Sequence, residues 1–178
     1  MTEWFKTGVR ILMLMHRRKD GGPKRKDRKA QRLISRNPEE FDEHWKYLQE
    51  LKNSSTLPYR IYSSVNERDI IKAIRLYKTQ QLELEWQDIK NQMNFYVQTE
   101  NQFMSCLAKP PCAKTKKFLI DLDDTTLLNQ TKEKLENITK IIDVRNTRNG
   151  YHMITEPYNP NLTPELEVKK DAMILLEW

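Results

Sequence analysis

Two aspartates that could bind a metal ion together stand at the end of a short apolar segment, residues 117–123 (KFLIDLD). The segment is typical of a buried strand, in which residues two apart point to the same face, so Asp121 and Asp123 project together. A Mg²⁺ or Mn²⁺ ion between them relieves their repulsion and takes the oxygen ligands it prefers. The spacing therefore predicts a metal site. The structural alternative is a strand end whose acids cap the next turn or neutralise a lysine.

A single histidine, His152, lies 29 positions after Asp123 and follows the turn signal Asn149-Gly150. Imidazole donates hydrogen bonds in both of its protonation states, so this side chain could contact an anionic ligand beside the two aspartates. The alternative is a structural histidine that is bonded to a backbone carbonyl group. The upstream pair of aspartates favours a functional role.

Periodicity and turn residues predict the elements that position these side chains. Asn37 begins an N-cap, proline and acid pattern followed by apolar residues at helical spacing, which predicts a helix over 37–51. Asn149-Gly150 predicts a hairpin of 141–145 and 151–155. Further helices are expected over 70–77 (after a cap at Asn66), 82–98 and 131–140, and strands over 59–65, 117–123 and 172–178. We expect an α+β fold, with a helical N-terminal half packed on one mainly antiparallel sheet in the C-terminal half.

Positive charge is concentrated near the N-terminus. The 178 residues carry a net charge of +6, and nine of the 31 basic residues fall between Arg17 and Arg32. The charge of this segment predicts salt-sensitive binding to nucleic-acid phosphates or, alternatively, a solvated loop. We expect a basic, partly flexible segment over 1–36 and a single α+β domain over 37–178. The candidate nucleic-acid-binding residues are Arg17, Arg18, Lys24, Arg25, Lys26, Arg28, Lys29 and Arg32.

Composition excludes several other classes of protein. The two cysteines are six positions apart without clustered histidines, which fits no zinc spacing. No apolar run approaches the roughly 20 residues of a membrane span. We therefore expect reduced thiols, a cytoplasmic location and no membrane partner.

The order of the motifs resembles the archaeo-eukaryotic primase superfamily. Its signature is a hydrophobic strand with D-x-D, a later strand with a small residue, any residue and His, and a last strand with a third acid. Residues 118–124 (FLIDLDD) match the first element and Gly150-Tyr151-His152 the second, with Gly where Ser is more usual. The third acid would be Asp171 or Glu177. The likeness covers residues 118–178, a third of the chain.

This resemblance implies a primase-like α+β fold and nucleotidyl transfer to a nucleic-acid 3′-hydroxyl. Asp121, Asp123 and the third acid would hold Mg²⁺ or Mn²⁺, and His152 would hold the nucleotide triphosphate. Cations are also needed around the leaving pyrophosphate, and the candidates are Arg60, Arg145 and Arg148. The implied partners are nucleotides and a DNA or RNA template, with a replication or host protein as a further partner. Residues 145–160 also resemble small proteins of large DNA phages, which implies the host cytoplasm.

Two alternatives stay open. The first is a primase-fold protein that has lost catalysis and binds nucleic acid or a host protein. The second is a haloacid-dehalogenase-like phosphatase, because residues 121–125 (DLDDT) match its D-x-D-x-T motif. In that family Asp121 would be the nucleophile and Asp123 the acid/base. Only 53 residues follow Thr125, too few for the doubly wound core of that family.

Overall fold

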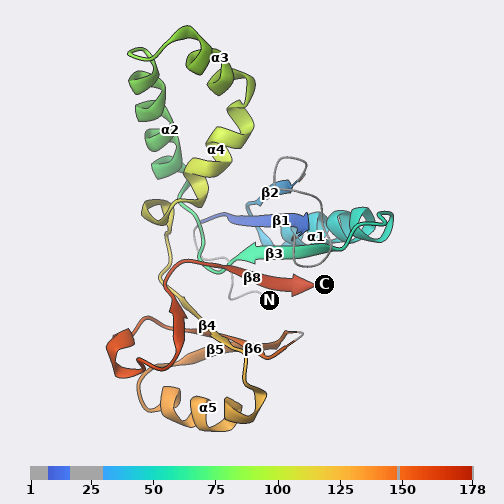
Figure 1. Ribbon diagram of the computed structural model, residues 1–178, viewed down its shortest axis with the longest axis vertical. Helices are drawn as coiled ribbons and strands as arrows, with labels where there is room; N and C mark the ends of the chain where they lie inside the picture. The colour runs from blue at the N-terminus through green and yellow to red at the C-terminus, as the bar shows by residue number, and fades with distance from the viewer. Residues whose placement is uncertain (1–7, 17–29, 148, 178) are drawn as a thin grey trace.

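The computed structural model (Figure 1) describes residues 8–16, 30–147 and 149–177. These residues form two four-stranded antiparallel sheets and a helical arm, so the fold is α+β. In Figure 1 the first sheet lies between the arm at the top and the second sheet at the bottom. No helix in the described part of the chain is long and apolar enough to cross a membrane.

The first sheet has the strand order β2-β1-β3-β8. Helix α1 packs on it, and Phe41 and Leu48 of this helix share a core cluster with Leu12 of β1. Asn37 caps the helix as predicted, since its side chain accepts a 2.8 Å hydrogen bond from the backbone N–H of Glu40. The elements are β1 (Arg10–His16), β2 (Gln31–Ser35), α1 (Pro38–Asn53), β3 (Tyr59–Ser64) and β8 (Met173–Glu177).

The helical arm follows β3 and consists of α2 (Ile70–Leu84), α3 (Ile89–Val97) and α4 (Thr99–Ala108). Asp69 caps α2 in place of Asn66. The reason is that Asn66 accepts a 2.7 Å hydrogen bond from the backbone N–H of Lys117. The helix expected over 82–98 is interrupted between α2 and α3, where Asp88 provides a new cap. The 3-10 helix η4 (Pro110–Cys112) follows α4, and its two prolines stand just past the end of that helix.

The second sheet has the strand order β5-β6-β4-β7, and α5 packs on one of its faces. Leu135 of α5 is fully buried against Ile120 and Met153 of the sheet. The predicted hairpin of β5 and β6 is confirmed. The strand order is that of a split β-α-β unit, with η6 in place of its second helix. The elements are β4 (Phe118–Leu122), η5 (Thr125–Leu127), α5 (Leu128–Glu136), β5 (Ile141–Asn146), β6 (Tyr151–Thr155), η6 (Pro160–Leu162) and β7 (Glu167–Lys169).

The expectation of one sheet beneath a helical N-terminal half is wrong, because helices and strands alternate along the chain and the strands divide between two sheets. The last strand, β8, pairs with β3 of the first sheet. Two further strands, β1 and β2, lie within residues 1–36 and pair with each other. The sequence pattern does not predict β1 because most of its residues are buried on both faces, so polar and apolar residues do not alternate.

One small cluster joins the two sheets. Val65 and Ile174, from the first sheet and its margin, pack with Leu119 and Ile154 of the second sheet. Leu119 and Ile154 lie on the sheet face opposite α5, since they alternate with residues that face the helix. The cluster therefore covers one end of that face. The side chains that follow along the same strands are polar.

Candidate functional site

Strand β4 lies between β6 and β7, and Asp121 occupies the position where titratable residues of all three strands meet. Its register partners are His152 on β6 and Glu167 on β7. Arg145 on β5 is in turn the partner of His152. Residues directly opposite each other in antiparallel strands share a face. Arg145, His152, Asp121 and Glu167 therefore form one line across the sheet, on the face opposite α5, and we call this line the Asp121 row.

Lys169 links the two acids of the Asp121 row. Its Nζ lies 2.6 Å from Oδ2 of Asp121 and 3.2 Å from Oε1 of Glu167. Like charges directly opposite each other across strands destabilise a sheet, and the shared ammonium group removes that cost. Burial lowers the pKa of Lys169, but its hydrogen bonds to Asp121 and Glu167 outweigh burial, so the pKa lies above its ordinary value. Lys169 is therefore charged at neutral pH.

His152 contacts the opposite side of Asp121. Its Nε2 lies 3.3 Å from Oδ1 of the carboxylate, and its side chain is 13% exposed. Burial lowers the pKa of His152, and the charge of Lys169 acts in the same direction, so together they exceed the opposing effect of Asp121. The imidazole is thus neutral at pH 7. Its Nδ1 is buried and has no partner among the described residues.

The lowered pKa of His152 makes stability depend on pH. In the unfolded chain the imidazole takes up a proton near pH 6.5, whereas the folded protein resists protonation until a lower pH. The unfolded state therefore binds more protons below pH 6.5, and the free energy of unfolding falls as the pH drops. Urea unfolding at pH 7.5 and pH 5.5 should show that the free energy of unfolding falls more for the wild type than for His152→Gln. An equal fall in the two proteins would contradict a lowered pKa for His152 in the folded state.

The hairpin before His152 approaches β4 so closely that only glycine fits. A Cβ atom on Gly150 would lie 1.9 Å from the carbonyl oxygen of Leu122. This contact explains why residue 150 is glycine. It also fixes the end of β4, where the D-x-D motif leaves the sheet, against the start of β6.

The remaining acids of the motif have different surroundings. Asp123 lies past the end of β4 and is exposed, while Asp124 caps η5 by accepting a 2.9 Å hydrogen bond from the backbone N–H of Thr126. Both parts of the structural alternative thus occur, since Asp121 neutralises a lysine and Asp124 caps a turn. As the side chains stand, the described residues contain no group of three metal-ligating side chains.

The two acids expected as the third metal ligand are held elsewhere. Asp171 forms a 2.8 Å ion pair with Arg68, and Glu177 forms a 2.8 Å ion pair with Lys52. Both acids belong to the first sheet or its margin, because β8 pairs with β3 and not with β4. The acid that lies next to Asp121 is instead Glu167.

The alternation of residues 166–169 (LEVK) could have identified Glu167. Leu166 and Val168 pack against the core beneath α5, so the two charged residues between and after them face the other way. Strand β7 has only three residues, and so short a strand cannot be recognised from a sequence pattern. Lys169 was missed for the same reason.

The other candidate cations are dispersed. Arg145 belongs to the Asp121 row and forms a 2.6 Å ion pair with Asp143. Arg60 lies in the first sheet opposite Met15, and Arg32 lies on β2 opposite Met13. Arg148 and the basic residues Arg17, Arg18, Lys24, Arg25, Lys26, Arg28 and Lys29 lie outside the described residues.

A buried arginine of the first sheet was not predicted. Arg10 on β1 is 1% exposed and donates a 2.7 Å hydrogen bond to the carbonyl oxygen of Ser64. Burial lowers the pKa of Arg10 to about 10, and the positive charge of Arg145 contributes to that shift.

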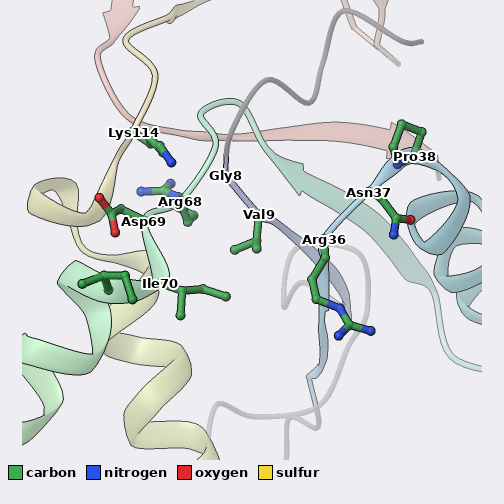
Figure 2. Close-up of a pocket in the computed structure, with 10 residues that line it drawn as sticks. Gly8, Val9, Arg36, Asn37, Pro38, Arg68, Asp69, Ile70 and Lys114 are labelled. Carbon is green, nitrogen blue, oxygen red and sulfur yellow. The ribbon is translucent and has the colours of Figure 1, made fainter.

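A cavity of about 600 Å³ lies at the N-termini of α1 and α2 (Figure 2). Arg36, Arg68, Asp69 and Lys114 contribute charged side chains to its lining. Arg68 is 2% exposed and is the ion-pair partner of Asp171. The cavity involves none of the residues of the Asp121 row.

Comparison with family models, with curated proteins and with solved structures finds no match to this chain.

Proposed function

We propose that this protein is a nucleotidyltransferase of primase-polymerase type and that the Asp121 row is its nucleotide site. The observation that carries the proposal is the strand register, in which Asp121 is the direct partner of both His152 and Glu167. Two acids that could bind a metal ion, and an imidazole that could donate a hydrogen bond to a phosphate group, thereby share one face of a sheet. The D-x-D and Gly-x-His motifs supply two of them, and β7 supplies the third.

The carboxylates of Asp121 and Glu167 would hold Mg²⁺ or Mn²⁺, and Asp123, which lies past the end of β4, is the third candidate ligand. Both carboxylates converge on the Lys169 ammonium group, so a metal ion bound here would take the place of that group. When bound, the metal neutralises the nucleotide phosphates and lowers the barrier to attack by a 3′-hydroxyl group. The protein contributes the carboxylate ligands and their spacing.

The other residues of the row would bind the triphosphate. His152 is neutral, so its imidazole can donate one hydrogen bond without repelling the metal. Arg145 and Lys169 stand on either side of the histidine and aspartate and would balance the negative charge of the leaving pyrophosphate. A DNA or RNA template would be held through its phosphates by the basic residues between Arg17 and Arg32.

The test is nucleotide incorporation by the full chain. Labelled NTPs or dNTPs, Mn²⁺ and a single-stranded template, with and without a primer, should yield an extended or newly initiated product. Product that forms with wild type and not with Asp121→Asn would support the proposal. Absence of product under every combination would count against catalysis.

One observation favours a second candidate, a primase-fold protein that binds nucleic acid without catalysis. Lys169 already neutralises Asp121 and Glu167, as a sheet without a metal ion requires. This candidate predicts salt-dependent retention of nucleic acid that survives Asp121→Asn and is lost when the charges between Arg17 and Arg32 are reversed. A haloacid-dehalogenase-like phosphatase is not proposed, because both sheets of the described chain are antiparallel and that fold requires a parallel core.

A further inference from the structure

The first sheet is covered on one face by α1 and only in part on the other. Leu12 of β1 and Ile61 of β3 pack against the helix, so the residues that alternate with them on the same strands face the other way. At one end of this second face, Ile11 and Met173 pack against the base of the arm. The side chains toward the other end of the strands belong to no core cluster of the described residues.

Six residues lie side by side at that uncovered end, and we call them the Tyr62 patch. Tyr62 on β3 lies directly opposite Met13 on β1 and Leu175 on β8. Residues directly opposite each other share a face of the sheet, and so do residues two apart on one strand. Every member except Leu175 is partly exposed. The patch consists of Met13, Met15, Arg32, Arg60, Tyr62 and Leu175.

The patch combines an aromatic ring, apolar side chains and positive charge. Arg32 and Arg60 provide two guanidinium groups, and none of the six residues is acidic. Glu177 of β8 lies on the other face, where it pairs with Lys52 of α1. Single-stranded nucleic acid uses both kinds of group, because its bases stack on aromatic rings and its phosphates bind basic side chains. A polyanion without bases would use only the two arginines.

The place of the patch in the chain also favours a nucleic acid. Strand β1 ends at His16 and β2 begins at Gln31, so the chain between them leaves and rejoins the sheet at the end where Met15 and Arg60 lie. Residues 17–29 include eight basic and two acidic residues. The most basic segment of the sequence is therefore attached beside the patch, and charge complementarity selects a polyanion as the occupant.

We infer that the Tyr62 patch binds single-stranded nucleic acid, with a base stacked on Tyr62 and phosphate groups bound by Arg32 and Arg60. An aromatic side chain on an open sheet face is a known way to hold an unpaired base. The inference rests on the nucleic-acid partner of the proposed function and not on metal-dependent catalysis. It adds base stacking to the charge that the basic residues between Arg17 and Arg32 provide.

Fluorescence anisotropy of labelled oligothymidylate and oligouridylate with the full chain, in the presence of EDTA, tests the stacking. Tyr62→Leu keeps an apolar side chain and removes the ring, so it should raise the dissociation constant at least about fivefold. Tyr62→Phe keeps the ring and should bind like the wild type. Tyr47→Leu is the matched control, because Tyr47 is 46% exposed on α1, on the other side of the sheet, and its loss should leave binding unchanged.

Two further measurements separate stacking from charge. An abasic chain of the same length has phosphates and no bases, so the wild type should bind it more weakly than the oligonucleotide, and Tyr62→Leu should bind it as the wild type does. Arg60→Gln should reduce the slope of log affinity against log salt concentration by about 0.7, the contribution of one phosphate contact to a single strand. Arg75→Gln, which removes an exposed charge from α2, should leave the slope unchanged.

The outcomes distinguish this inference from the proposed nucleotide site. Equal binding of the oligonucleotide by wild type and Tyr62→Leu, or an unchanged salt slope for Arg60→Gln, would overturn the inference and leave the nucleotide site untouched. A wild type that binds no oligonucleotide at low salt would overturn it as well. Oligonucleotide binding that depends on Tyr62 in a protein that incorporates no nucleotide would support the inference and count against catalysis alone.

Discussion

Asp121→Asn should reduce metal-dependent nucleotide incorporation by at least about 100-fold, the size of effect seen when a single charge-stabilising group is removed from a transition-state site. The change keeps the size of the side chain and its position opposite His152 and Glu167. It removes the negative charge that would bind the metal. The measurement is the initial rate of product formation under Mn²⁺ at saturating template.

Two companion variants make this result specific. Glu167→Gln should lower the rate comparably, since its carboxylate shares the same positive charge. Glu133→Gln removes one exposed carboxylate from α5, which lies on the other face of the same sheet, and should leave the rate unchanged. If Glu133→Gln and Asp121→Asn reduce the rate equally, the loss reflects the overall charge of the protein and the assignment of the row fails.

Asp171→Ala should have a large effect on stability. The Arg68 side chain is 3% exposed, and Asp171 is its ion-pair partner at 2.8 Å. Removing one member of a buried pair leaves an uncompensated charge, which costs about 3–5 kcal/mol of the free energy of unfolding. Urea denaturation monitored by circular dichroism measures this loss. Under conditions where the variant remains folded, its affinity for nucleotide should match that of the wild type.

A surface ion pair supplies the control. Nζ of Lys134 lies 2.5 Å from Oε1 of Glu165, but the two side chains are 43% and 52% exposed. Glu165→Ala should therefore change the free energy of unfolding little. A similar small effect of both variants would show that Asp171 does not stabilise Arg68. Loss of nucleotide affinity in folded Asp171→Ala would restore it as a candidate metal ligand.

Local signals in the sequence predicted those elements that local interactions determine. The N-cap at Asn37 and the turn at Asn149-Gly150 each specify an element through contacts within a few residues, and both elements occur as expected. The cap at Asn66 failed as a local signal because that side chain bonds to a residue 51 positions away. No short-range pattern contains that information.

The sequence could not predict how the strands divide between two sheets, because that division also depends on contacts between distant residues. The pairing of β8 with β3 joins segments more than 100 residues apart, and it leaves Asp171 and Glu177 with ion-pair partners other than the residues around Asp121. The register joins Asp121 of the D-x-D motif to His152, whereas Asp123 lies past the end of β4. Glu167 and Lys169 could be assigned only once β7 was seen to pair with β4.

The most direct test of the proposed site is Mn²⁺ binding in the presence of a nucleoside triphosphate, followed by electron paramagnetic resonance. The account predicts that wild-type protein sequesters the Mn²⁺–nucleotide complex, that Asp121→Asn and Glu167→Gln both lose it, and that Asp171→Asn retains it. Equal sequestration by all four proteins, or none by wild type, would show that these two carboxylates on neighbouring strands are no metal–nucleotide site.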